Sequence, residues 1–172
     1  SEFGQFIEWK YDDSLDWHLL NYPMHLAMHD YVRQLNGYYV DHPELWEEDC
    51  DWSGFSWISC DDNDNSAIAF FRTGKDETDS TVVICNFTPV VRHSYRIGVP
   101  VKGDYVEVFN SDAEAFGGSN VLNEGVFAAQ DVPMHGMDQS IELTLPPLAT
   151  IYLRRKGCEA EKTDCEEEQL NG

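Results

Sequence analysis

The sequence is poor in positive charge. Its 172 residues include 11 lysines and arginines against 32 aspartates and glutamates, which gives a formal net charge of −21 at pH 7. A protein that binds DNA, RNA or an anionic membrane needs a basic surface to face the phosphates. The deficit therefore argues against nucleic acid and membranes as partners. We favour an acidic protein of the cytoplasm over one that attracts a basic partner.

Paired cysteines and long apolar runs are also missing. The cysteines are odd in number and include no CxxC pair: Cys50, Cys60, Cys85, Cys158 and Cys165. This pattern predicts free thiols in a reducing compartment rather than a disulfide framework. No apolar stretch approaches the roughly 20 residues of a membrane-spanning helix, and no signal-peptide pattern opens the chain. The first residue is not methionine, so we expect a piece of a longer protein.

The stretch that organises the rest of the sequence is Thr81–Pro89. Its residues 82–85 form an unbroken apolar run, which predicts a strand covered on both faces. About eight short strands at regular spacing are typical of a Greek-key β-sandwich, so we expect a mainly β fold. The other expected strands are one from Phe55, then Ser66–Thr73, Ser94–Val99, Tyr105–Asn110, a short edge strand at Val126–Ala129, Gln139–Leu145 and Leu148–Arg154.

A segment of a different kind precedes these strands. Residues 1–22 show no periodicity and carry too many large apolar groups for a solvated arm. A helix is expected next, with Asn21 as cap and Pro23 in its first turn. A short second helix is expected at His42–Trp46. The first helix carries an apolar stripe at helical spacing, formed by Met24, Met28, Tyr31, Leu35 and Tyr38.

Two patterns hint at metal binding, and we favour a structural interpretation of both. His25 and His29 have the spacing of zinc ligands on a helix, but the HExxH pattern is absent. The turn Asp61–Asn65 resembles the start of a calcium loop, but Ser66 and Arg72 occupy the positions of its glycine and its bidentate glutamate. No nucleophile elbow and no buried carboxylate pair is visible. We therefore expect no catalytic residue, no metal and no cofactor in this chain.

Seven motifs in one order resemble the 1,4-α-glucan branching enzymes of the glycogen type. The resemblance runs from about Glu2 to Leu153, which is most of the chain. The motifs are EFGQFIEW at Glu2–Trp9, SLDWHLLNYP at Ser14–Pro23, HPELWE at His42–Glu47, CNFTPV at Cys85–Val90, YRIGVP at Tyr95–Pro100, NSDAEAFGGS at Asn110–Ser119 and LTLPPLAT at Leu143–Thr150.

The resemblance implies a domain organisation. Enzymes of the α-amylase superfamily have a (β/α)8 barrel followed by a β-sandwich. Residues 1–47 would be the C-terminal end of the barrel, residues 48–156 the sandwich, and residues 157–172 an acidic tail outside the shared pattern. The helix stripe would then lie against the barrel strands. Because those strands are absent here, we expect the stripe to promote self-association rather than fold back on the sandwich.

The resemblance also implies a function. The family cleaves an α-1,4-glucan and transfers the segment to a 6-hydroxyl, using a carboxylate nucleophile and a carboxylic acid. Those acids lie upstream, so the parent would be an enzyme and this chain inactive, with α-glucan and the rest of the barrel as the parent's partners. Gln5 and Trp9 would lie near the barrel mouth, where they contact substrate or, as we favour, pack the loop. An alternative is a glucan-binding sandwich with an aromatic platform, drawn from Trp52, Trp57, Phe70, Phe116 and Phe127.

Overall fold

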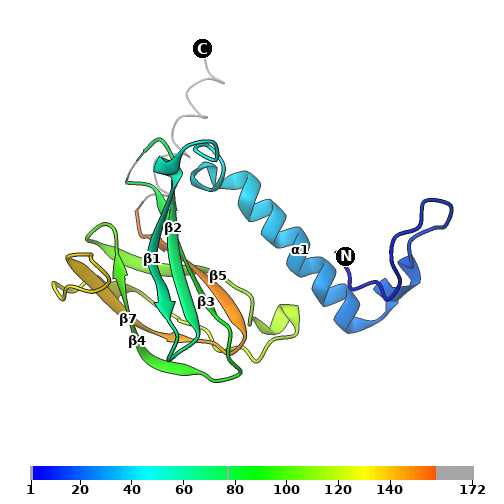
Figure 1. The fold of residues 1–172 in the computed structure, drawn as a ribbon. Helices are drawn as coiled ribbons and strands as arrows, with labels where there is room; N and C mark the ends of the chain where they lie inside the picture. Colours follow the sequence, from blue (N-terminus) through cyan, green and yellow to red (C-terminus); the bar gives the residue numbers. More distant parts are fainter. Residues whose placement is uncertain (1, 77, 158–172) are drawn as a thin grey trace, which may run out of the picture.

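The computed structural model describes residues 2–76 and 78–157 of the chain (Figure 1). These residues form two antiparallel sheets. The large sheet has the order β1-β2-β3-β8-β5-β6, and the small sheet pairs β4 with β7. The predicted mainly β fold is confirmed, with strand ends that move by a few residues. The strands are β1 (Phe55–Asp62), β2 (Ala67–Thr73), β3 (Ser80–Asn86), β4 (Arg92–Val99), β5 (Asp104–Asn110), β6 (Phe127–Ala128), β7 (Gln139–Leu145) and β8 (Ala149–Arg155).

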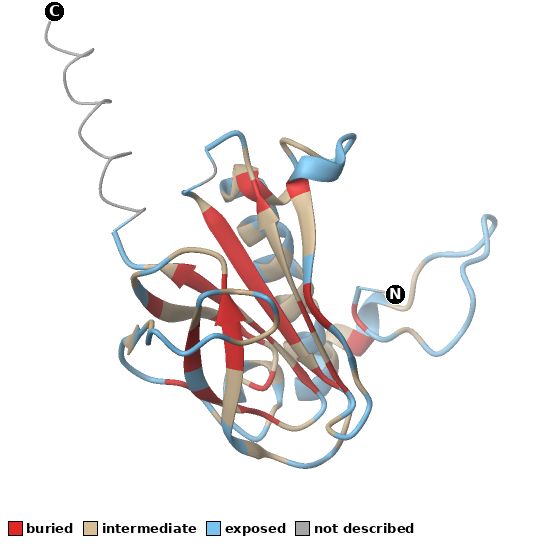
Figure 2. Cartoon of the chain, turned by 60° about the vertical axis from the view of Figure 1, so that its left-hand side comes forward, coloured by how far each residue is buried: buried red, intermediate tan, exposed pale blue. Residues whose placement is uncertain are grey.

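Strand β3 lies inside the large sheet and is buried along most of its length. Val82 and Ile84 are 0% and 1% exposed and belong to the core between the two sheets. Val83 alternates with them, so it points to the opposite face, and it is only 4% exposed. The prediction of a strand covered on both faces is therefore confirmed. Figure 2 shows the buried residues concentrated on the strands. The core consists of Ile58, Ala67, Ala69, Val82, Ile84, Ile97, Val99, Tyr105, Ile141, Leu143, Leu145, Ile151 and Leu153.

Helix α1 (Pro23–Asp41) covers part of the outer face of the large sheet (Figure 1). Pro23 occupies the first turn as predicted, although Tyr22 rather than Asn21 is the N-cap residue. The expected second helix is a short 3-10 turn, η2 (Pro43–Leu45). The remaining 3-10 turns are η1 (Trp17–Asn21), η3 (Trp52–Gly54) and η4 (Glu114–Phe116). No helix of the described residues is long and apolar enough to cross a membrane.

The expectation that the helix stripe does not fold back on the sandwich is wrong for Tyr31 and Tyr38, whereas Met24 and Met28 are 64% and 39% exposed. Tyr31 and Tyr38 lie on the sandwich, with ring centroids 5.9 and 6.1 Å from that of Phe109. Tyr38 also contacts the ring of Tyr152 on β8 at 5.3 Å. The physical reason is that the outer face of the large sheet carries aromatic side chains of its own and is not closed without the helix. Self-association of the chain stays a prediction.

The segment before α1, residues 2–22, extends away from the sandwich, and we call it the arm (Figure 1). Phe3 is 4% exposed and stacks on Trp17 at 5.4 Å. Leu19 is also 4% exposed, but Phe6, Ile7, Trp9 and Tyr11 are 57–85% exposed, although their apolar character argued against a solvated arm. The acidic tail and the thiols of Cys158 and Cys165 lie outside the described residues.

Candidate functional site

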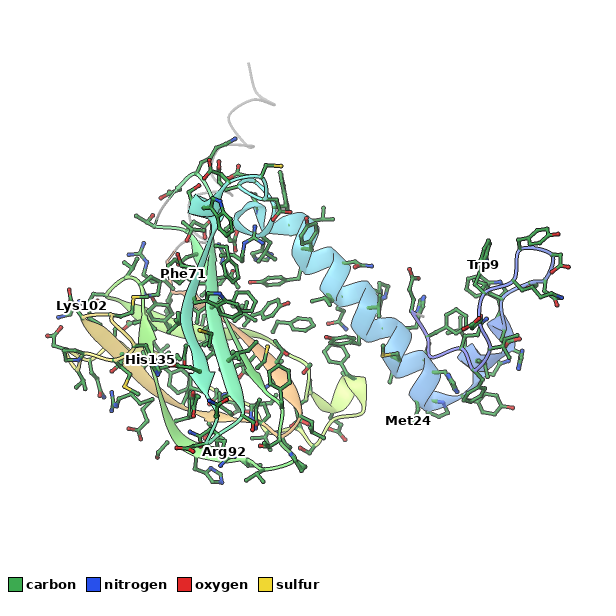
Figure 3. All side chains as sticks on the ribbon, viewed as in Figure 1. Trp9, Met24, Phe71, Arg92, Lys102 and His135 are labelled. Carbon is green, nitrogen blue, oxygen red and sulfur yellow. The ribbon has the colours of Figure 1, made fainter. Side chains whose placement is uncertain are left out.

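Both substrate-contact candidates of the arm line one cavity. This arm cavity has a volume of about 470 Å³ and is lined by Glu2, Phe3, Gln5, Ile7, Glu8, Trp9, Leu15 and Trp17. The Gln5 amide forms two hydrogen bonds with the backbone of the arm. Its Oε1 accepts a hydrogen bond from the backbone N–H of Asp16 at 3.3 Å, and its Nε2 donates one to the carbonyl of Ile7 at 3.1 Å. Trp9 is 73% exposed and stands far from the sandwich (Figure 3). The Gln5 amide is therefore held within the arm, whereas the indole of Trp9 is exposed.

The structure brings together some of the platform candidates and separates the others. Phe55, Trp57 and Phe70 form an aromatic cluster on the outer face of β1 and β2, with ring centroids 5.0–5.9 Å apart. Trp57 is 50% exposed within this cluster, and Trp52 on η3 is 91% exposed. The other two candidates are engaged elsewhere: Phe116 contacts Tyr31 and Phe109, and Phe127 packs against the core.

The metal-binding patterns have structural partners instead. His25 Nδ1 lies 2.8 Å from the carbonyl oxygen of Phe3, so the ring ties α1 to the arm. In the hairpin turn, the Asp62 carboxylate accepts hydrogen bonds from Asn65 and from the hydroxyl of Tyr95. Among the described residues no group of three or more histidine, cysteine, aspartate or glutamate side chains could hold a metal ion.

A buried ion-pair network joins η2 to the large sheet. Glu44 is 1% exposed, and its Oε1 accepts a hydrogen bond from the Thr81 hydroxyl at 2.7 Å and lies 3.2 Å from Arg154 Nε. Arg154 also pairs with Asp79. The hydroxyl of Tyr38 lies 3.2 Å from that of Thr81, and burial raises the pKa of this phenol. Sequence reasoning missed the network because Glu44 looked like one of many surface acids.

Comparisons with known proteins assign most of the sandwich to a family. Residues 57–156 match the family described as the α-amylase C-terminal all-β domain. The chain belongs to this family. Its α-amylase C-terminal domain begins within β1 and ends just after β8, so it contains Trp57 and Phe70 of the aromatic cluster and Arg154. Glu44 lies before it, so the buried ion-pair network fastens the domain to the helix that precedes it.

Curated relatives of the chain are longer proteins. It is 52% identical over 153 residues to the 1,4-α-glucan branching enzyme GlgB of Halothermothrix orenii, which covers 89% of this chain and 24% of the relative. It is 51% identical over 156 residues to GlgB 1 of Xanthomonas axonopodis pv. citri, covering 91% and 22%. It is 43% identical over 170 residues to GlgB of a Synechocystis species, covering 99% and 22%. The chain thus spans about a quarter of the length of these relatives.

Among solved structures, a mutant isomaltulose synthase of Erwinia rhapontici NX5 in complex with D-glucose matches with a TM-score of 0.44 and 16% identity, over 74% of this chain and 18% of that one. A likeness of this size supports no argument about function.

Proposed function

We propose that the chain is the C-terminal portion of a 1,4-α-glucan branching enzyme. Identity of 43–52% over 89–99% of the chain, to relatives that bear that name, is the observation that carries the proposal. The parent would cleave an α-1,4-glucan and transfer the segment to a 6-hydroxyl, which creates the α-1,6 branches of glycogen. Residues 48–156 would stabilise the end of the barrel, and residues 1–47 would be that end.

The surface of the N-terminal segment supports its assignment to the barrel. Twelve of the twenty exposed large apolar side chains among the described residues lie before residue 47. On α1 they include Leu26 at 45% and Val40 at 68% exposure. Burying such side chains contributes about 1.5–3 kcal/mol each. We propose that the arm and the outer face of α1 contact the rest of the barrel, while the inner face of α1, with Tyr31 and Tyr38, packs against the sandwich.

We further propose that the chain alone is inactive, without catalytic residue, metal or cofactor. Transfer with retention needs a pair of carboxyl groups flanking the reacting bond. The most buried carboxylate of the described residues, Glu44, forms an ion pair with Arg154 and accepts a hydrogen bond from Thr81, which supports a structural role. Trp9, and less directly Gln5, would contact glucan at the barrel mouth. The thiols of Cys50, Cys60 and Cys85 are free, which supports a cytoplasmic location.

A chimera tests these proposals. This chain replaces the aligned region of the Halothermothrix orenii enzyme, and branching of amylose is followed by the fall in iodine absorbance. We expect the chimera to branch amylose and the chain alone to leave the absorbance unchanged. Trp9→Ala in the chimera should raise KM for amylose, whereas Tyr11→Ala, a matched change at an arm residue with 85% exposure, should not. A folded but inactive chimera, or branching by the chain alone, would contradict the assignment.

A second candidate function is a glucan-binding module, and the half-exposed Trp57 in the aromatic cluster favours it. Planar aromatic side chains on a sheet face are suited to stack on sugar rings. The test is calorimetric titration of the chain with maltoheptaose. Trp57→Ala should abolish the heat, and Trp52→Ala serves as a control at an exposed tryptophan outside the cluster. If neither the chain nor its variants bind, the sandwich is a structural domain only.

A further inference from the structure

A polar cavity lies beside β4, in a part of the sandwich remote from α1 and the arm. It has a volume of about 500 Å³. Its walls come from three places that are distant in sequence: the β1–β2 turn, residues 91–96 around the start of β4, and the loop at Met134 and His135. Figure 3 labels Arg92 and His135 on these walls. We propose that this β4 cavity binds the oxyanion group, phosphate or carboxylate, of a small ligand.

The first observation is a positive charge without a counter-ion. Arg92 Nη2 donates a hydrogen bond to the backbone carbonyl of Asn65 at 3.2 Å, and Nε has no partner. No carboxylate of the described residues lies within 4.0 Å of the Arg92 guanidinium, in contrast to the partly buried Arg72 and Arg96. Such an arginine is unusual in a chain with 32 acidic residues. Because Nε is buried, a ligand in the cavity reaches the guanidinium through its Nη groups, and the uncompensated charge there strengthens hydrogen bonds to an oxyanion.

The second observation is that His135 has a ring nitrogen, Nε2, left as a hydrogen-bond donor. The backbone N–H of Gly98 points at His135 Nδ1, at a distance of 3.3 Å. Nδ1 is therefore the acceptor of the neutral ring, which places the proton on Nε2. The backbone of His135 is left-handed, with a φ of 52°, and so is that of Ser94 across the cavity, with the same value. His135 takes this conformation in a two-residue turn with Gly136 between the paired Met134 and Met137, and Ser94 takes it at the irregularity in the pairing of β4 with β7.

The third observation is that the carboxylate in the cavity wall, that of Asp62, is already hydrogen-bonded. The Asp62 carboxylate accepts hydrogen bonds from the amide groups of Asn65 and from the Tyr95 hydroxyl, which lies 2.8 Å from its Oδ2. Arg96 is also engaged, with Gln130, Ser140 and Glu142. Donors remain on Arg92, His135 and the exposed His93, and the walls also carry the acceptors Asn65 Oδ1 and Ser94 Oγ. The uncompensated charge of Arg92 is what favours an anionic group over a neutral sugar.

The test is an amide NMR titration of the chain with inorganic phosphate up to about 20 mM, with sodium chloride adjusted to hold the ionic strength constant. We expect saturable shifts at Asn65, Ser94 and His135. Arg92→Gln should weaken binding about tenfold or more, since it removes a charge-assisted pair of hydrogen bonds. Arg33→Gln is the matched control, because Arg33 is exposed on α1 and far from the cavity, and it should leave the affinity unchanged.

The outcomes are separable. Acetate in place of phosphate should shift the same amides if any oxyanion is recognised. If phosphate shifts them and acetate does not, the ligand class is narrowed to phosphate esters. If Arg92→Gln does not fold, His93→Gln on the exposed rim should still weaken binding severalfold. Shifts that do not saturate, an equal loss in Arg33→Gln, or shifts of the same amides by maltoheptaose but not by phosphate would each overturn the proposal.

Discussion

Replacing Arg154 by methionine should destabilise the chain strongly, because it breaks the buried ion-pair network from its centre. Arg154 is 5% exposed and forms an ion pair with Glu44, whose carboxylate accepts a hydrogen bond only from the hydroxyl of Thr81 among the described residues. Removing one member of a buried pair costs about 3–5 kcal/mol, since it leaves the other charge uncompensated. Domains of this kind have a total stability of about 5–15 kcal/mol. A loss of this size would therefore lower the Tm by roughly 10 °C.

Urea unfolding, followed by tryptophan fluorescence and far-UV circular dichroism, measures the change. The control is Arg33→Met, which breaks the exposed pair of Arg33 with Asp30 and should cost less than about 0.5 kcal/mol. In the double variant Glu44→Leu with Arg154→Met, both charges are gone, so part of the lost stability should return. The reasoning is refuted if Arg154→Met costs less than about 1 kcal/mol, or if the double variant is no more stable than the single one.

Three further predictions concern the core, the pH dependence and the surface. Ile84→Ala should cost about 2–5 kcal/mol in urea unfolding, because Ile84 is 1% exposed inside the large sheet; a cost under about 1 kcal/mol would contradict its central place. Burial raises the pKa of Glu107, although hydrogen bonds from Asn123 and Asn110 act against it. The folded state therefore binds the Glu107 proton more tightly than the unfolded state does. The stability that this protonation adds at low pH is lost as the pH rises above 4.5 and through the raised pKa. Glu107→Gln should flatten this decline in a series of urea midpoints. The chain should self-associate through the outer face of α1, so its light-scattering mass should rise with concentration and fall in Leu26→Asp; a monomer over a hundredfold range would count against it.

The strands could be predicted because their pattern is local. Ile141, Leu143 and Leu145 alternate with Glu142 and Thr144, and the structure buries the first three at 0–4% exposure. Such alternation follows from the two-residue period of a strand and needs no knowledge of its neighbours. The helix from Pro23 was predictable for the same reason, with its period of 3.6 residues.

The candidate sites were predictable only in part. Gln5 and Trp9 were named from the resemblance, and the structure places both at the arm cavity, with Gln5 packing the loop and Trp9 open. The sequence offered five aromatic residues as candidates for a sugar-binding platform. Only the fold shows that Trp57 is half exposed, whereas Phe116 packs against Tyr31 of the helix. The β4 cavity has no sequence signal, since its walls come from three separate segments.

The sequence by itself determined the strands and the long helix to within a few residues, the acidic character and, through its motifs, the family. Tertiary structure alone decided which surface the helix covers. The stripe of α1 showed that one face is apolar, but an apolar face is complementary to any other apolar face, because the hydrophobic effect is non-directional. Phe109 and Tyr152 therefore had to be placed together on one sheet before Tyr31 and Tyr38 had a partner. Glu44 and Arg154 likewise meet across 110 residues of chain, a pairing that depends on the order of the strands and on no pattern within either segment.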